Sequence, residues 1–175
     1  EKLTQFISGL NDSLTRRVIE IVGAGHDLAG RDWAWLAFGS EGRDEQTFST
    51  DQDNGIVFAC ADEAAVDGLR QRFLAFALEV NKDLDRCGFP LCKGNIMASN
   101  PQWCLSLDEW KEQFSQWIRV PQPEALLNAT IFFDFRTLFG KAELAEAMRR
   151  HLLMQTSSNP MFLRCMAQNA LDVEP

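Results

Sequence analysis

Helical periodicity dominates the pattern of apolar and polar positions along this chain. In residues 2–22, apolar side chains recur every three or four positions, which predicts an amphipathic helix that ends at Gly23. A second stripe with the same spacing runs through residues 62–86, and Asp62 suits the positive N-terminal end of that helix. Residues 106–119 open with the capping-box pattern Ser-x-x-Glu, which predicts a third helix.

Shorter apolar runs between these helices predict a sheet. Residues 33–38 form an unbroken apolar run of strand length, and residues 53–60, whose apolar part is Ile56-Val-Phe58, are the second predicted strand. Residues 91–99 follow the helix-breaking residues Gly88 and Pro90 and precede an Asn-Pro turn, so they are the best candidate for a third strand. The order of these segments predicts a β-α-β core with one added strand.

The C-terminal part of the chain begins beyond Pro121 and Pro123. Residues 131–135 are rich in the β-branched and aromatic side chains that are typical of a strand. We nevertheless favour one helix over residues 124–139, because that segment starts after a proline, ends at Gly140 and is apolar on nearly all sides, as a buried bundle helix is. Two more helices are expected after it.

Candidate chemistry gathers in residues 38–58, between the first two predicted strands. Gly39-Ser40 follows the first strand, where the turn into a short helix leaves backbone N–H groups free to bind a phosphate. Asp51 and Asp53 stand at the head of the second strand. Because side chains alternate along a strand, the two carboxylates project from the same side, about 7 Å apart along the backbone, and can hold one hard cation. A triphosphate at the turn would need Mg²⁺ to offset its charge.

This arrangement resembles the DNA polymerase beta-like nucleotidyltransferase superfamily, whose signature is Gly-Ser followed by Asp-x-Asp on the next strand. The longer string is Gly-Ser-Glu-Gly-Arg-Asp-Glu-Gln-Thr at residues 39–47, with Thr-Asp-Gln-Asp-Asn at residues 50–54. It looks like the uncharacterised nucleotidyltransferase domains related to PII-protein uridylyltransferase and glutamine-synthetase adenylyltransferase, which often follow CBS or cyclic-nucleotide-binding domains. The resemblance covers residues 30–150 and is sharpest at residues 38–58.

The resemblance implies an α/β (α+β) fold, in which a polymerase beta-like mixed sheet is flanked by helices and followed by part of a C-terminal helical bundle. We expect a lead-in helix in residues 1–30, the nucleotidyltransferase core in residues 31–120, and the start of a substrate-side bundle in residues 121–175. The chain opens at Glu1 directly in helical pattern, so we expect it to be a piece of a longer polypeptide that contains regulatory domains.

The resemblance also implies an activity, the transfer of a nucleotidyl group from an NTP to a hydroxyl of a protein or small molecule. Asp51 and Asp53 would bind Mg²⁺ or Mn²⁺, and Gly39, Ser40 and Arg43 would bind the phosphates. Each has a simpler interpretation as well, since the aspartates can cap an Asx-type turn, Ser40 can cap a helix, and Arg43 can pair with a neighbouring acid. An EF-hand calcium loop is excluded, because its required glycine and bidentate glutamate are both absent.

Active members of the superfamily usually carry a third carboxylate on the third strand, and residues 88–95 contain no acid. The nearest downstream substitutes are Asp108 and Asp134. The missing acid motivates an alternative function, a catalytically inactive module that senses nucleotides. It does not change the assignment of the fold.

Several further residues are expected to support the site. Lys93 lies near the start of the predicted third strand, where it either contacts the nucleotide or is simply solvated. Glu45 matches an acid of the resembled transferases but is as well suited to brace the loop, and Asn54 ends the Asp-x-Asp-Asn string. Asp134 and Arg136 lie in a largely apolar segment, so they either face the substrate or form a buried polar anchor.

The composition limits the partners of this chain. A formal net charge of −8 disfavours a nucleic-acid partner, because phosphate backbones are held mainly by Lys and Arg. No apolar run is long enough for a membrane span, so no membrane partner is expected either. The five cysteines are odd in number and lack Cys-x-x-Cys spacing, which favours reduced thiols in a cytoplasmic protein.

Overall fold

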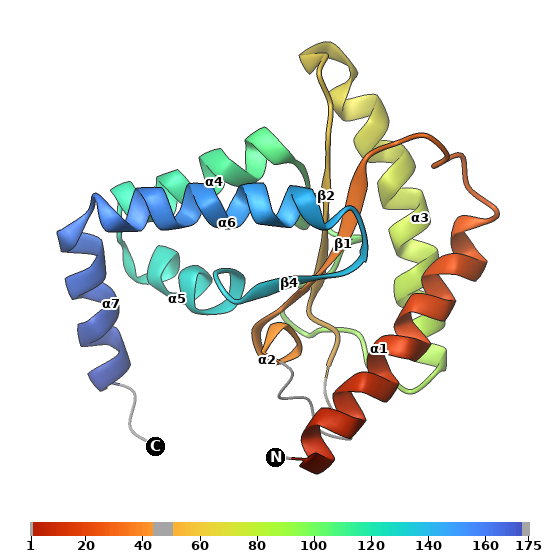
Figure 1. Cartoon of the computed structure of the whole chain (residues 1–175), viewed down its shortest axis with the longest axis horizontal. Coiled ribbons are helices and arrows are strands. Elements are labelled where there is room, and N and C mark those ends of the chain that lie inside the picture. Colours follow the sequence, from red (N-terminus) through yellow and green to blue (C-terminus); the bar gives the residue numbers. More distant parts are fainter. Residues whose placement is uncertain (1, 44–50, 173–175) are drawn as a thin grey trace.

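The computed structural model describes residues 2–43 and 51–172 and has a four-stranded sheet with helices on both faces (Figure 1). In chain order the elements are α1 (Lys2–Gly23), β1 (Trp33–Phe38), α2 (Gly39–Gly42), β2 (Asn54–Phe58), α3 (Val66–Arg86), β3 (Cys104–Ser106), α4 (Leu107–Arg119), α5 (Pro123–Phe132), β4 (Phe135–Gly140), α6 (Ala142–Ser157) and α7 (Pro160–Asp172). Within the described residues, no helix is both long and apolar enough to cross a bilayer.

The sheet is mixed, in the strand order β3-β2-β1-β4. β1 pairs antiparallel with β2 on one side, where Ala34 lies opposite Val57, and antiparallel with β4 on the other, where Phe38 lies opposite Phe135. β2 pairs in parallel with the short strand β3. The expected class of a mixed α/β sheet flanked by helices is therefore confirmed.

β1 lies at the centre of the molecule because helices cover both of its faces. Trp33 and Trp35 point toward α1 and α3, whereas Leu36 and Phe38 point toward α4, α5 and α6, as the alternation of side chains along a strand requires. All six residues of β1 are buried. An unbroken apolar run is the pattern of such a doubly covered strand, which is why the sequence located β1 correctly.

The helices that show clear periodicity or caps are confirmed. α1, α3 and α4 occupy the predicted segments, and the 3₁₀ turn Glu63–Ala65 precedes α3. The predicted capping box is present at the start of α4. The Ser106 hydroxyl accepts a hydrogen bond from the Glu109 backbone N–H (3.2 Å), and the Glu109 carboxylate accepts one from the Ser106 N–H (2.7 Å).

The prediction of a third strand over residues 91–99 is wrong. That segment is an irregular loop in which Asn95 adopts a left-handed conformation, with φ 56°. It still runs beside the start of β2, because the Asn54 N–H donates to the Ile96 carbonyl (3.1 Å). The third strand is instead β3, and the hydrophobic pattern could not identify it because three residues are too few to show a period.

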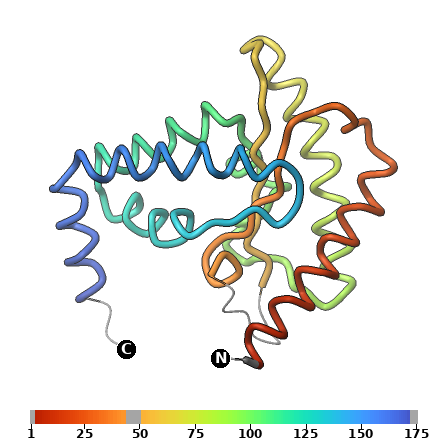
Figure 2. Tube along the Cα trace, viewed as in Figure 1, coloured from red at the N-terminus to blue at the C-terminus, as the bar shows by residue number. Residues whose placement is uncertain are grey.

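The prediction of one helix over residues 124–139 is also wrong in its second half. α5 ends at Phe132, and β4 follows it and pairs with β1, about a hundred residues earlier in the chain (Figure 2). The buried backbone of β1 needs hydrogen-bond partners at both edges, and β4 supplies them at the second edge. The strand-like run at residues 131–135 did not locate β4 either, because Ile131 and Phe132 lie in α5 and only Phe135 belongs to β4.

We expect Gly140→Ala to destabilise the fold more than Gly88→Ala. Both glycines have φ near +90°, which costs an alanine about 1–2 kcal/mol. Only at Gly140 would the new methyl group also collide with the Trp33 carbonyl oxygen and approach the Ala34 Cα to 2.9 Å, whereas it would meet nothing within 4 Å at Gly88. Overpacking should add roughly 1–3 kcal/mol at Gly140. Urea unfolding measures both, and equal losses would contradict the close approach of β4 to β1.

Candidate functional site

The glycine-serine turn and the Asp-x-Asp pair meet at one end of the sheet, because β1 and β2 run antiparallel. The Phe38 N–H donates a hydrogen bond to the Asp53 carbonyl (3.0 Å). The next residue, Gly39, donates its N–H to the Asp134 carbonyl, also at 3.0 Å. Three segments that are far apart in sequence are thus joined by backbone hydrogen bonds at the end of β1.

Two glycines let α2 lie close against the start of β2 and of β4. Gly39 has φ +55°, and a Cβ there would lie 3.8 Å from the Asp53 Oδ2. At Gly42 a Cβ would collide with the Asp134 carbonyl oxygen. The Arg43 N–H closes the turn by donating to the Gly39 carbonyl (3.0 Å), and Ser40, between the glycines, is partly exposed.

Asp53 points away from α3 and toward the turn. Its neighbours Gln52 and Asn54 both accept hydrogen bonds from the Asn81 side chain of α3 (2.8 and 3.0 Å), and side chains alternate, so Asp53 faces the other way. The Cys92 thiol donates to the Asp53 Oδ1 (3.4 Å). The buried amide of Asn54 also accepts the Ala98 N–H (2.9 Å), so Asn54 ties β2 to α3 and to the loop that follows.

The pKa of Asp53 is raised to about 6, mainly by burial and in part by the nearby carboxylate of Asp51, while the Cys92 hydrogen bond acts in the opposite direction. A cation bound by Asp51 and Asp53 would offset the free-energy cost of ionising the buried Asp53 carboxyl. Paired carboxylates are also donors that Mg²⁺ and Mn²⁺ prefer. Among residues 2–43 and 51–172, no group of three His, Cys, Asp or Glu side chains is assembled around one point. Phosphate oxygens and water are suited to supply further ligands.

Glu41 is a buried acid at the site that the sequence did not reveal. Glu41 is the buried residue of α2, and burial raises its pKa to about 8, although a hydrogen bond from the Asp53 backbone N–H and the charge of Arg136 act in the opposite direction. Glu41 is therefore mainly protonated at neutral pH. The acids between residues 41 and 53 look like one solvated loop in the sequence, and no pattern separates Glu41 from the others.

Arg136 anchors the turn to α1. It makes a two-pronged ion pair with Asp12 of α1, with both N–O distances at 2.8 Å, and its Nε donates to the Glu41 carbonyl (3.1 Å). Of the two sequence interpretations of Arg136, these contacts match the buried polar anchor. Asp12 is the second residue of the site region that carried no signal in the sequence.

Of the two substitutes for a third carboxylate, Asp134 lies at this end of the sheet. Its side chain is half exposed and pairs with Arg43 (2.9 Å). Lys93 is exposed in the loop next to Cys92. Glu45, the remaining predicted residue, lies outside the described part of the chain.

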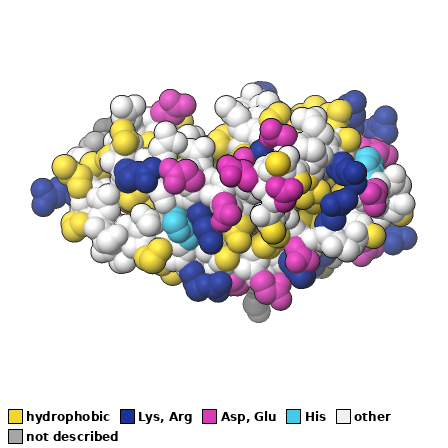
Figure 3. Space-filling view, turned by 90° about the horizontal axis from the view of Figure 1, so that it is seen from above, with side chains coloured by type: hydrophobic (Ala, Val, Ile, Leu, Met, Phe, Trp, Pro, Cys, Tyr) yellow, Lys and Arg dark blue, Asp and Glu magenta, His cyan; other side chains and the backbone are white. Residues whose placement is uncertain are grey.

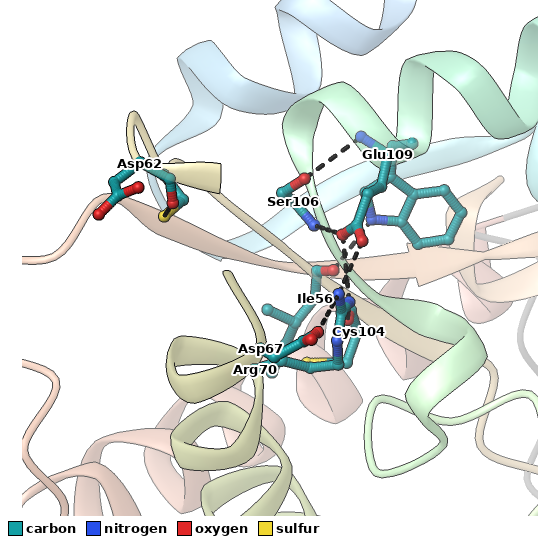
Figure 4. A network of polar contacts seen from close by, with 9 residues as sticks. Ile56, Asp62, Asp67, Arg70, Cys104, Ser106 and Glu109 are labelled. Atoms are coloured by element: carbon teal, nitrogen blue, oxygen red, sulfur yellow. Dashed lines mark hydrogen bonds and ion pairs between the residues drawn. The ribbon is translucent and has the colours of Figure 1, made fainter. Parts of the chain in front are cut away.

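Asp108 lies at the opposite end of β2. The register pairs Phe58 with Ser106, so Asp108 follows the end of β2 that is remote from Asp53. It lines a hollow of about 610 Å³ together with other acids (Glu63, Asp67 and Glu109), and acidic side chains gather near the middle of this face in Figure 3. Glu109 is neutralised there by Arg70 (2.7 Å), which also contacts Asp67 (Figure 4). Asp108 cannot complete a site at Asp53.

The raised pKa of Glu41 predicts how stability depends on pH. The folded state holds the Glu41 proton up to about pH 8 and the unfolded state releases it near 4.5, so the free energy of unfolding should fall as pH rises through this window. The Asp53 carboxyl acts in the same direction but only up to about pH 6. We expect Glu41→Gln, which cannot ionise, to flatten the fall between pH 6 and 8 in urea unfolding.

The exposed Glu146→Gln is the matched control and should leave the pH profile unchanged. Parallel stability profiles of wild type and Glu41→Gln above pH 6 would show that Glu41 ionises normally in the folded protein.

The family comparison agrees with this geometry. Residues 1–124 match the family model described as "Putative nucleotidyltransferase DUF294", which covers well over half of the chain and includes the turn, the Asp-x-Asp pair and the loop at Cys92. No curated protein and no solved structure matches the chain significantly. On this match the chain belongs to the DUF294 family of nucleotidyltransferases.

Proposed function

We propose that this chain transfers a nucleotidyl group from an NTP to a hydroxyl of a protein or small molecule, in a reaction that requires Mg²⁺ or Mn²⁺ and releases pyrophosphate. The observation that carries the proposal is the contact between the two halves of the motif. Gly39 donates its N–H to the Asp134 carbonyl, and a Cβ at Gly39 would lie 3.8 Å from the Asp53 Oδ2, so the turn and the carboxylate are separated by little more than the width of a methyl group. A phosphate on the turn and a cation on the aspartates would therefore touch one another.

Each residue at this end of the sheet has a role in the proposed reaction. Asp51 and Asp53 would hold the cation, which when bound offsets the charge of the triphosphate and lowers the pKa of the acceptor hydroxyl. The Gly39 N–H is already bonded to the Asp134 carbonyl, so Gly39 would contribute by letting the phosphates approach the backbone closely, and Ser40 would orient them through its backbone N–H and hydroxyl. Arg43 is at the mouth of the turn, where its guanidinium could exchange Asp134 for a phosphate oxygen.

Residues farther from the turn would keep its elements in position or help to bind the phosphates. Lys93 would approach the phosphates from the loop beside Cys92, and Arg136 would keep α2 in place through the Glu41 carbonyl. Asn54 would fix the start of β2. Glu45 is expected to brace the loop between the two halves of the motif.

The acceptor and biological role follow from the resemblance to PII-protein uridylyltransferase. We propose a role in signalling, with a protein acceptor and regulatory domains elsewhere in a longer chain. The five cysteines are free thiols in the structure, which fits a reducing, cytoplasmic compartment. The net charge of −8 argues against a nucleic acid as the acceptor.

One observation favours the alternative of a nucleotide sensor without turnover. The side chain that meets Asp53 from the loop after α3 is the Cys92 thiol, at the place where active relatives are expected to carry an acid. Asp134, the acid on the correct side of the sheet, is paired with Arg43. Nucleotide binding needs neither a third carboxylate nor an ionised Cys92.

Label transfer tests the enzymatic proposal. With Mg²⁺ or Mn²⁺ and α-³²P-labelled NTPs, we expect wild type to label an acceptor in lysate, and Asp51→Asn and Asp53→Asn each to reduce labelling by about 100-fold or more, because the cation loses a ligand. Asp108→Asn is the matched control and should transfer normally, since it lies at the far end of β2. The proposal fails if the two site variants match wild type.

Calorimetry with the same NTPs separates the two functions. Tight binding without release of pyrophosphate would favour the sensor, and the Asp51→Asn variant should then bind more weakly in the presence of Mg²⁺. If no NTP binds in the presence of either cation, both functions are excluded.

A further inference from the structure

α1 has two apolar faces, and only one of them is covered by the domain. The inner face packs on α3 and β4 through residues such as Thr15, Ile19 and Val22. With a rotation of 100° per residue, a second set of large side chains lies on the opposite side of the helix. This α1 stripe consists of Leu3, Phe6, Leu10, Leu14 and Ile21, which are 64%, 70%, 62%, 37% and 60% exposed.

The α1 stripe is large enough to form an interface. Its five side chains together expose on the order of 500 Å² of apolar surface, which is near the upper range for a patch on a monomer. Two copies packed face to face would bury roughly 1,000 Å², the lower limit for a specific interface. A weak, reversible association is the result that this area supports.

We propose that the α1 stripe is the contact of a homodimer, in which the α1 helices of two copies pack antiparallel. The positions of the stripe residues are nearly symmetric about position 12 of the helix. In that register Leu3 lies opposite Ile21 of the second copy, and Leu10 lies opposite Leu14 of the second copy. A surface that is complementary to itself in this way is the requirement for a closed two-fold contact.

The charges on α1 agree with this pairing. The chain carries −8 overall, but residues 2–23 contain three basic and two acidic residues, so two copies can meet here without mutual repulsion. Arg17 lies beside the stripe, between Leu14 and Ile21, and it is ion-paired with Glu20 (3.1 Å). The antiparallel register brings Arg17 near the Phe6 ring of the second copy, which is a favourable contact, whereas a parallel register would place it against Arg17 of the second copy.

The same helix holds the candidate site on its inner face. Asp12 sits at the centre of the proposed two-fold contact and faces inward, where it binds Arg136, which in turn holds the Glu41 carbonyl. A second copy would therefore clamp α1 from outside against the residues that position α2. The dimer itself does not depend on whether the site transfers nucleotides.

A pair of complementary charge variants tests this interface and its register. The 175-residue chain, kept reduced, is examined by sedimentation velocity over about 10–200 µM, where a contact of this size should give a concentration-dependent dimer. We expect Leu10→Glu and Leu14→Lys each to weaken self-association at least tenfold. Mixing the two variants should restore a heterodimer, because the introduced glutamate of one copy then faces the introduced lysine of the other, and the second leucine pair remains native.

Leu153→Glu is the matched control, since Leu153 is 62% exposed on α6, away from the stripe, and this variant should dimerise like wild type. Circular dichroism checks that each variant is folded. The proposal is overturned if wild type stays monomeric at every concentration, as it would when another partner covers the stripe. It is equally overturned if both stripe variants dimerise normally, or if their mixture remains monomeric.

Discussion

The candidate site depends on the pairing of β1 along both of its edges. β1 is buried on both faces, so its backbone hydrogen bonds must be completed by β2 and β4 rather than by water. Both neighbours run antiparallel to β1, and the end of β1 therefore meets the starts of both strands. Gly39 follows β1, Asp53 precedes β2 and Asp134 precedes β4, so this one constraint brings the three together.

Packing several acids at one end of a sheet has an electrostatic cost that protons offset in the unliganded protein. Glu41 is mainly neutral because burial raises its pKa to about 8. The pKa of Asp53 is raised less, to about 6. Arg136 balances Asp12 in the layer behind them. A divalent cation at Asp53 would take over the role of the proton, because it stabilises the ionised carboxylate. A positive charge at this end of the sheet would therefore be stabilised by the acids around it.

Features whose cause is local could be predicted from the sequence. β1 is an unbroken apolar run, α4 begins with a capping box, and the Gly-Ser and Asp-x-Asp strings lie within twenty residues of one another. β3 and β4 could not be located, because a strand is selected by its partner, and neither partner is near in sequence. Glu41 was missed for a related reason, since α2 packs against β4 and α5, which lie far away in the sequence.

The most direct test of a metal-nucleotide site at this end of the sheet is a crystal structure with Mn²⁺ and a nonhydrolysable NTP analogue, read by the anomalous signal of manganese. We expect a manganese peak in contact with both Asp51 and Asp53, and a triphosphate against the backbone of Gly39 and Ser40. A manganese ion found only in the acidic hollow at Asp67 and Asp108, or a nucleotide bound away from the turn, would contradict it.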